Sequence, residues 1–126
     1  MTARRLGLAP LVVLLAAPPS ALGSSSKPRT VAPTFAERAA ILRAFGDPPT
    51  ASPCLAPRLA ASNRDYATVR FRTTKACRRW AFNGTNIFKR GKDDHWRLVG
   101  GGSAYHCPLP RIPAQVQRDL SVCPHP

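Results

Sequence analysis

The chain has 126 residues, with 19 Lys or Arg against 6 Asp or Glu, and a formal net charge of +13 at pH 7. The length accommodates one domain and argues against a multidomain protein. The charge favours anionic partners, and the few carboxylates argue against a hydrolase built on a carboxylate pair.

The N-terminus has the pattern of a secretory signal peptide. Arg4 and Arg5 form a short positive region, an uncharged apolar stretch covers Leu6 to Ala17, and small residues lead up to Gly23. The apolar stretch is shorter than the roughly 20 residues that a spanning helix needs. We therefore expect a signal peptide at residues 1–23, cleaved after Gly23, and a secreted product without a stable membrane span.

Residues 24–33 are rich in Ser, Pro and basic side chains, and we expect a flexible leader there. A single domain is then predicted over residues 34–126. Thr34 and Glu37 have the spacing of a capping box at the start of an amphipathic helix. Gly46 suits a left-handed cap at its end, and the helix must bury its apolar face on the rest of the domain.

The middle of the chain predicts strands. Residues 47–57 are Pro-rich and are expected to be irregular, whereas Tyr66 to Thr74 alternates apolar and polar side chains as a half-buried strand does. Residues 79–90 are expected to be extended. The dipeptide Asn83-Gly84 predicts a hairpin turn within them, and the alternative is a loop that leads into a strand over residues 85–90.

The C-terminal part predicts one or two further strands and a short helix. A polar turn at residues 91–94 precedes a strand from His95 to Val99, and the glycines at 100–102 are expected to relax that strand before Ser103–Cys107. Pro113 suits the first position of a helix that runs to Leu120. The predicted fold is α+β: an N-terminal amphipathic helix and a short C-terminal helix packed on an antiparallel three- or four-stranded meander.

The mature chain contains an even number of cysteines, which in a short exported protein indicates disulfides. They are Cys54, Cys77, Cys107 and Cys123. Four cysteines allow three pairings, and we favour 54–77 with 107–123 because each closes a short segment that contains turn residues. Close pairs such as C-x2-C, which zinc sites use, are absent from the sequence, so neither a metal site nor a cofactor is expected.

Three runs near the C-terminus carry a resemblance to a known group of proteins. They are W-R-L-V at Trp96–Val99, G-S-x-x-x-C at Gly102–Cys107 and I-P-x-x-V-x-x-D-L-x-x-C at Ile112–Cys123. Together they resemble small secreted four-cysteine actinobacterial proteins of uncharacterised function. The helix followed by a meander is also similar in outline to cystatin-like rolls. Neither resemblance implies a catalytic residue.

Basic residues on the predicted strands define a candidate anion-binding face. If the strands pair as expected, these cations share the side of the sheet away from the core. They are Arg70, Arg72, Lys89, Arg90 and Arg97. The aromatic rings of Tyr66, Trp80 and Tyr105 would add stacking area. The same cations also suit the ordinary solvent face of a two-sided antiparallel sheet.

Two histidines allow a different class of function. A ribonuclease-like hydrolase would place His95 and His106 around a phosphate, together with one of Lys89, Arg90 or Lys92. This hypothesis requires the two rings to meet in the fold.

The segment Pro108–Pro113 allows a third class, an inhibitor of an extracellular enzyme. Its prolines make it rigid, and a disulfide would frame it. The leading hypothesis is a secreted, non-enzymatic basic binding protein. Its partner would be an anionic cell-wall, lipid or nucleic-acid surface, or an acidic protein.

Overall fold

The computed structural model describes Ala16 and residues 28–46, 49–80 and 84–123. The predicted signal peptide, apart from Ala16, and the Asn83 position of the predicted hairpin turn lie outside these residues. Within the part of the chain that the structure describes, no helix is long and apolar enough to cross a bilayer.

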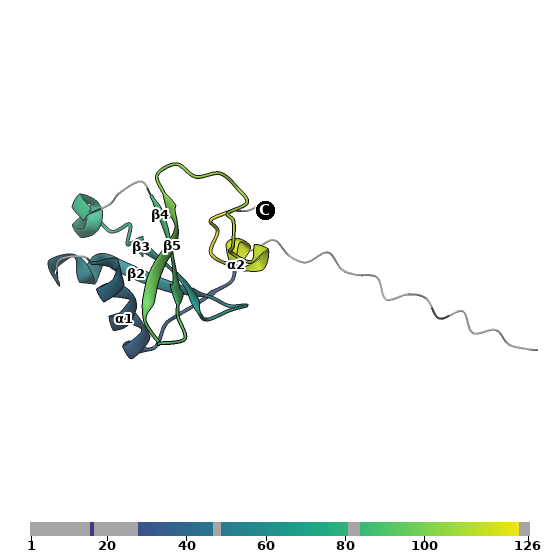
Figure 1. Cartoon of the computed structure of the whole chain (residues 1–126). Helices are drawn as coiled ribbons and strands as arrows, with labels where there is room; N and C mark the ends of the chain where they lie inside the picture. The colour runs from purple at the N-terminus through teal and green to yellow at the C-terminus, as the bar shows by residue number, and fades with distance from the viewer. Residues whose placement is uncertain (1–15, 17–27, 47–48, 81–83, 124–126) are drawn as a thin grey trace, which may run out of the picture.

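Five antiparallel strands form one sheet in which every strand pairs with its neighbour in sequence (Figure 1). The strands are β1 (Thr30–Val31), β2 (Leu55–Ala60), β3 (Tyr66–Phe71), β4 (Thr85–Arg90) and β5 (Trp96–Gly102). The helices are α1 (Phe35–Phe45), α2 (Ala114–Asp119) and two 3-10 helices, η1 (Pro49–Cys54) and η2 (Lys75–Trp80). The antiparallel meander and the α+β class are confirmed, but the sheet has five strands rather than three or four.

Local hydrogen bonds define the ends of α1. The Glu37 backbone N–H donates to the Thr34 hydroxyl, and the Thr34 N–H donates to the Glu37 carboxylate at 2.8 Å. Together these bonds satisfy two of the N–H groups that a helix start leaves without partners. Gly46 ends the helix with a φ of 79°, a left-handed conformation that costs glycine little.

The two faces of the sheet carry separate apolar clusters, because α1 covers one face and α2 covers the other (Figure 1). Beneath α1 lie Ile41, Leu55, Leu59, Ala67, Val69, Phe88 and Trp96. Beneath α2 lie Ala60, Tyr66, Ile87, Ile112, Val116, Leu120 and Val122. The sheet therefore does not have the open solvent face that the alternation in β3 predicted.

The buried side-chain amide of Asn86 connects β3 and β4 beyond the point where their backbone pairing ends. The backbones pair only at Tyr66 and Ala67 with Lys89 and Phe88. Farther along, the Asn86 side chain accepts a hydrogen bond from the Val69 N–H at 2.8 Å and donates to the Val69 carbonyl at 3.1 Å. The side chain of Asn86 thus replaces one rung of the ladder inside the core.

Gly101 allows a close approach between β4 and β5. Its φ is +116°, and a Cβ at this position would lie 2.1 Å from the Thr85 carbonyl oxygen. The three glycines at 100–102 were expected to relax the strand. They instead belong to β5, which continues to Gly102 because a residue without a side chain fits against β4.

Both predicted disulfides are present. Cys54 pairs with Cys77 and joins η1 to η2, and Cys107 pairs with Cys123 and closes the segment that contains α2. The structure therefore confirms the pairing that the short closed segments favoured.

Four expectations about local structure are wrong. Part of the segment expected to be a flexible leader forms β1, and β2 begins at Leu55 within the segment expected to be irregular. Trp80 ends a 3-10 helix where extended chain was expected, and the predicted strand ends at Phe71, not Thr74. The sequence did not predict β2 because Pro57 and Arg58 interrupt its apolar pattern. Proline, which has no backbone N–H, is tolerated at position 57 because β1 pairs only with Leu59 and Ala60 and leaves the edge of β2 unpaired there.

Candidate anion-binding site

The five cations predicted to share one face are divided by the structure. Lys89 and Arg97 lie opposite each other on β4 and β5, and the Lys89 ammonium lies 5.5 Å from the centre of the Tyr66 ring. Arg90 follows Lys89 in the strand and points to the other face, the one covered by α1. Arg70 and Arg72 lie on and just beyond β3, outside the cavity that Lys89, Arg90 and Arg97 help to line.

Arg90 is a structural residue rather than part of an open face. Its guanidinium lies 2.8 Å from the Asp65 carboxylate and within 4 Å of Glu37 and Asp94. It also stacks over Trp96, 5.4 Å from the ring centre. Carboxylates from two turns and α1 therefore surround Arg90, an arrangement that does not favour its predicted role in the anion-binding face.

Arg97 is also neutralised. Its guanidinium donates through both NH2 groups to the Asp93 carboxylate. This hydrogen bond, the His95 N–H and the Arg97 charge hold the pKa of Asp93 well below its ordinary value. We call this region the paired end of the sheet: the β4–β5 turn, the turn before β3 and the first turn of α1.

A cavity of about 470 Å³ lies at the paired end. Its lining combines the cations with a carboxylate: Asp65, Lys89, Arg90, Gly91, Lys92, Arg97 and Val99. Within the described residues, only Lys89 and Lys92 among its cations lack a carboxylate within 4 Å. The net positive charge in the cavity is therefore smaller than the number of basic residues in its lining indicates.

Arg70 supports the packing of α2. Its guanidinium donates to the Leu120 carbonyl at 2.6 Å, at the C-terminal end of that helix. Cations are favourable at this end because the last carbonyls of a helix lack partners. The neighbouring Thr68 is 1% exposed. The sheet is therefore covered at Thr68, whereas the Arg70 side chain stays exposed beside α2.

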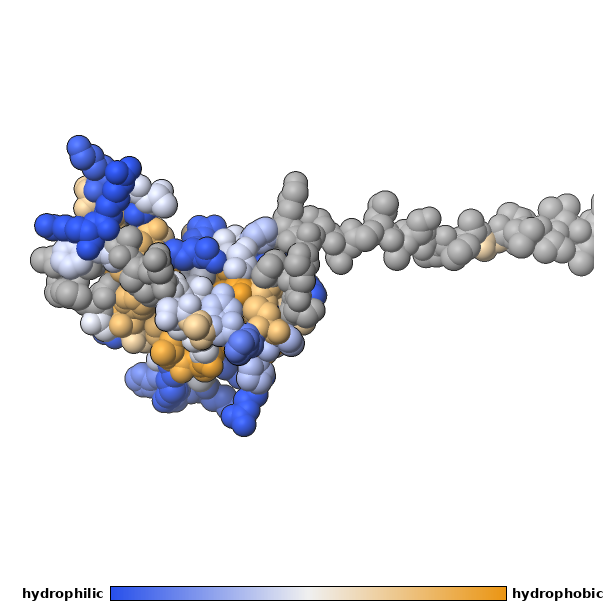
Figure 2. Space-filling view, turned by 90° about the horizontal axis from the view of Figure 1, so that it is seen from above, coloured by the Kyte–Doolittle hydropathy of each residue, from blue (hydrophilic) through white to orange (hydrophobic). Residues whose placement is uncertain are grey.

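The opposite end of the sheet carries cations without acids. Lys75, Arg78 and Arg79 are exposed on η2, which Cys77 anchors through its disulfide to Cys54. We call these three cations the η2 cluster. No carboxylate of the described residues lies within 4 Å of any of them. In Figure 2 strongly hydrophilic side chains project from the left of the molecule, the side on which η1 and η2 lie in Figure 1.

An aromatic ring accompanies the η2 cluster. The Arg79 guanidinium lies 4.9 Å from the centre of the half-buried Trp80 ring. Sequence reasoning considered Trp80 for stacking but missed the three cations before it. A usable signal was present, because no Asp or Glu occurs between Asp65 and Asp93 while eight Lys or Arg do.

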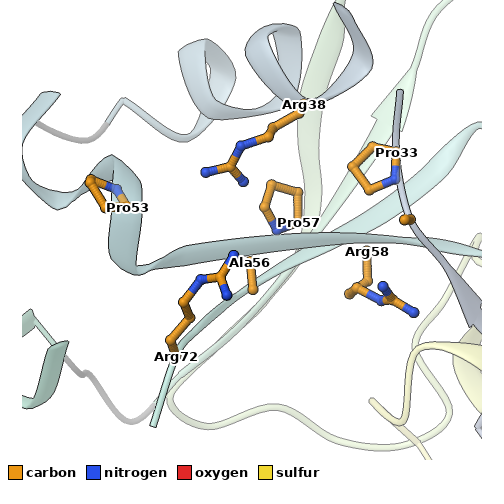
Figure 3. A pocket seen from close by; sticks show the side chains of 8 residues that line it. Pro33, Arg38, Pro53, Ala56, Pro57, Arg58 and Arg72 are labelled. Atoms are coloured by element: carbon orange, nitrogen blue, oxygen red, sulfur yellow. The ribbon is translucent and has the colours of Figure 1, made fainter. Parts of the chain in front are cut away.

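A groove of about 450 Å³ lies beside the η2 cluster, along the open edge of β2 (Figure 3). It combines three arginines with three prolines, and its lining is Ala32, Pro33, Arg38, Pro53, Ala56, Pro57, Arg58 and Arg72. We call it the arginine groove. It is open here because β1 pairs only with the last two residues of β2.

Backbone carbonyls hold two of the groove arginines in place. Arg38 of α1 donates to the Leu55 carbonyl at 3.1 Å and to the Ser52 carbonyl at 3.0 Å. Arg58 donates to the hydroxyl and the carbonyl of Thr30, at 3.0 and 3.2 Å. Both guanidinium groups are therefore positioned before any ligand arrives, which lowers the entropic cost of binding.

Arg72 completes the arginine groove. Its side chain is exposed, and no hydrogen bond or ion pair joins it to another described side chain. In Figure 3 Arg38 reaches toward β2 from α1, Arg72 lies on the other side of the β2 ribbon beside Ala56, and Arg58 points toward the other end of the groove. Of the predicted face, Arg70 and Arg72 lie away from the paired end without a carboxylate within 4 Å among the described residues, and Arg72 is the one that lines this groove.

The two histidines do not meet. His95 lies beside the end of β4 and lines a cavity with Asp93 and Asp94. His106 follows Tyr105, whose hydroxyl lies 3.5 Å from Thr85, the first residue of β4. The histidines therefore lie near opposite ends of β4, a strand of six residues that is about 20 Å long. This separation does not support the ribonuclease-like arrangement.

The segment Pro108–Pro113 is held by one side chain. Gln117, which is 1% exposed, accepts from the Leu109 N–H at 2.9 Å and donates to the Leu109 carbonyl at 2.9 Å. It also donates to the Ile112 carbonyl at 2.7 Å. Between these anchors Arg111 is exposed, with a positive φ of 63°.

No family model, no curated protein and no solved structure matches the chain. The resemblance of the C-terminal runs to small secreted actinobacterial proteins stays a prediction.

Proposed function

We propose that the domain is a secreted, non-enzymatic binding module that engages anionic polymers or surfaces through the η2 cluster. The observation that carries this proposal is the unequal pairing of charge. Lys75, Arg78 and Arg79 project from a disulfide-anchored helix without a carboxylate nearby in the described residues. Secretion is supported by the signal pattern at residues 1–23 and by the two disulfides.

The affinity of the η2 cluster for a polyanion depends on the counterions that binding releases. A linear polyanion carries condensed cations, and Lys or Arg side chains that neutralise its charges release those cations with a gain of entropy. Three contacts give a slope of log affinity against log salt of about −2 for a single-stranded polyanion. The ring of Trp80 adds a surface on which a planar group can stack.

Charge-matched variants test the proposal. The cluster variant is Lys75→Gln/Arg78→Gln/Arg79→Gln. The control is Arg43→Gln/Lys92→Gln/Arg111→Gln, which removes the same charge from exposed cations elsewhere. The probes are single-stranded DNA, inorganic polyphosphate and vesicles containing phosphatidylglycerol, each titrated from about 50 to 200 mM salt.

We expect the oxidised wild-type domain to bind at least one probe with a steep salt dependence. The cluster variant should lose about tenfold or more in affinity and flatten the slope by about 2, while the control keeps most of the affinity. Equal losses in both variants would show that net charge, and not the η2 cluster, governs binding. Absence of binding by the wild type would refute the proposal.

A second candidate function is inhibition of a trypsin-like protease by the segment Pro108–Pro113. The observation that favours it is the rigid presentation of Arg111 between backbone groups held by Gln117. Such proteases bind a single Arg or Lys side chain in an acidic pocket. Preincubation with trypsin should then reduce protease activity, and Arg111→Gln should abolish the effect. Full protease activity at equimolar wild-type protein would exclude this candidate.

A further inference from the structure

We infer that the arginine groove is a discrete subsite for the phosphoryl groups of a linear polyanion. This inference rests on the proposed function and names the ligand class that the η2 cluster and its neighbouring groove would share. It concerns Arg38, Arg58 and Arg72, none of which belongs to the η2 cluster.

The first argument is uncompensated charge in a partly enclosed space. The three guanidinium groups line one groove, and none has a carboxylate within 4 Å among the described residues. Arg38 and Arg58 are half-buried, so water screens them less than it screens the η2 cluster. Their hydrogen-bond partners are neutral carbonyl and hydroxyl groups, which leave the positive charge in place. An anion in the groove would remove this repulsion.

The second argument is the spacing of the cations. Along β2, Arg38 and Arg72 lie on the Pro53 side of Pro57, on opposite sides of the β2 ribbon, and Arg58 lies on the Pro33 side (Figure 3). The groove therefore offers two positive points along β2 rather than one. A ligand with repeated anionic groups can occupy both points, whereas a small single anion can occupy only one.

The third argument selects phosphoryl over carboxylate groups. Arg38 reaches the groove from α1 and Arg72 from the chain beyond β3, so their donors approach one ligand from different elements. Tetrahedral phosphoryl oxygens accept hydrogen bonds from several directions, while the two oxygens of a carboxylate lie in one plane. The guanidinium fork also matches phosphate oxygens in pairs, and the groove contains Arg and no Lys.

The edge of β2 argues against a peptide strand as the occupant. A strand that adds to a sheet needs free N–H and C=O groups along the edge. Pro57 has no N–H, and the Leu55 carbonyl already accepts from Arg38. The groove therefore blocks strand addition while it keeps its guanidinium groups available.

Tripolyphosphate is the probe that isolates the groove from the η2 cluster, because it is short and carries neither base nor lipid. Its binding to the oxidised domain is measured by calorimetry at constant ionic strength, and backbone amide shifts of Ala32 and Ala56 report the location. The variants are Arg72→Gln, whose side chain has no partner among the described residues, and Arg58→Lys, which keeps the charge and loses the fork. Arg43→Gln on α1, outside the groove, is the control.

We expect Arg72→Gln to weaken tripolyphosphate binding about tenfold, the effect of one charge-assisted contact. Arg58→Lys should weaken it less, and Arg43→Gln and the cluster variant should leave it within about twofold. The amides of Ala32 and Ala56 should shift on binding. Long polyphosphate should bind more tightly than tripolyphosphate and lose affinity in both the groove and the cluster variants.

Three results would overturn the inference. The first is that both groove variants bind tripolyphosphate with the affinity of the wild type. The second is that the wild type binds the tricarboxylate tricarballylate as tightly as it binds tripolyphosphate. A third is binding to phosphatidylglycerol vesicles that Arg72→Gln leaves unchanged while polyphosphate does not bind, which would point to a lipid surface. If the cluster variant still loses polyanion binding in these cases, the proposed function stands and only the groove assignment fails.

Discussion

The paired end of the sheet places Asp65, Asp93 and Asp94 beside its cations, whereas the end that carries η1 and η2 places cations beside prolines, carbonyls and Trp80. Both ends hold basic residues. Among the described residues, most cations of the paired end have a carboxylate within 4 Å, with Lys89 and Lys92 as the exceptions, whereas no cation of the η2 cluster or the arginine groove has one. Position relative to carboxylates therefore says more about anion binding than the net charge of +13 does.

The ends also differ in what holds them together. Ion pairs around Arg90 connect three segments at the paired end. At the other end a disulfide joins η1 to η2, and a single buried amide, that of Asn86, connects β3 to β4. Ion pairs at a surface contribute little, so the second end should be the more costly to disturb.

Removal of the Cys54–Cys77 disulfide should have the largest effect. The double variant Cys54→Ala/Cys77→Ala should lose about 3 kcal/mol of unfolding free energy, because the bridge closes a segment 23 residues long. It should also lose polyanion affinity, since η2 is no longer anchored. Urea denaturation and polyphosphate titration measure the two effects. Cys107→Ala/Cys123→Ala is the control, and it should destabilise the domain without reducing affinity in the folded fraction.

Substitution of Asn86 should have the next largest effect. Asn86→Ala leaves the N–H and carbonyl of Val69 without partners inside the core, and we expect a loss of about 2 kcal/mol in unfolding free energy. Substitution of Asn63, an exposed amide in the turn before β3, is the matched control. A similar loss for Asn63→Ala would contradict the role given to Asn86.

Acid should weaken the fold through carboxylates that the folded chain holds ionised. Burial alone would raise the pKa of Asp119, but hydrogen bonds from Ser62 and Gln115 and the charge of Arg29 hold it below its ordinary value. A group with a lowered pKa stabilises the fold above the ordinary value of about 4, and that contribution is lost as the pH falls through the folded value.

The Asp119 contribution is tested by urea midpoints measured at pH 7 and at pH 3. Asp119→Asn should lower the midpoint at pH 7 and reduce the difference between the two pH values, because Asn carries no charge to lose. Asp94→Asn, at an exposed position in the β4–β5 turn, is the control and should keep the wild-type difference. An unchanged difference in Asp119→Asn would place the acid sensitivity elsewhere.

Loss of Arg90 should have the smallest effect. Its pairs with Asp65, Glu37 and Asp94 are exposed to solvent to different degrees, and such pairs typically contribute about 1 kcal/mol or less. Arg90→Gln should therefore change the unfolding free energy by about that amount and leave polyanion affinity unchanged. A loss of affinity similar to that of the cluster variant would show that Arg90 takes part in polyanion binding. It would contradict the proposed difference between the two ends of the sheet.

The parts of the fold that sequence could predict depend on short-range patterns. The alternation within β3 predicted that Ala67, Val69 and Phe71 share one side, and they pack toward α1. The disulfide pairing followed from the spacing of cysteines. The side-chain alternation depends only on neighbouring residues, and the disulfide pairing was predicted from the length of the segment that each bridge closes.

The parts that sequence could not predict depend on distant contacts. β1 is a strand because it pairs with β2, and β2 is a strand because it pairs with β1 and β3, although Pro57 and Arg58 break the apolar pattern of β2. The division of the predicted basic face has the same cause. Arg70 donates to the Leu120 carbonyl, and Asp65 approaches Arg90 from another turn, and the strand sequences reveal neither contact.

The two tryptophans place one intrinsic fluorophore at each end of the molecule. Trp96 is 7% exposed beneath α1, and Trp80 is half-buried beside Arg79. Iodide, an anionic quencher, concentrates near unpaired cations, so it should quench Trp80 strongly and Trp96 weakly, while caesium should quench both poorly. The fluorescence of Trp80 in the unlabelled protein should therefore report the local electrostatic potential at the basic end, with the buried Trp96 as an internal reference.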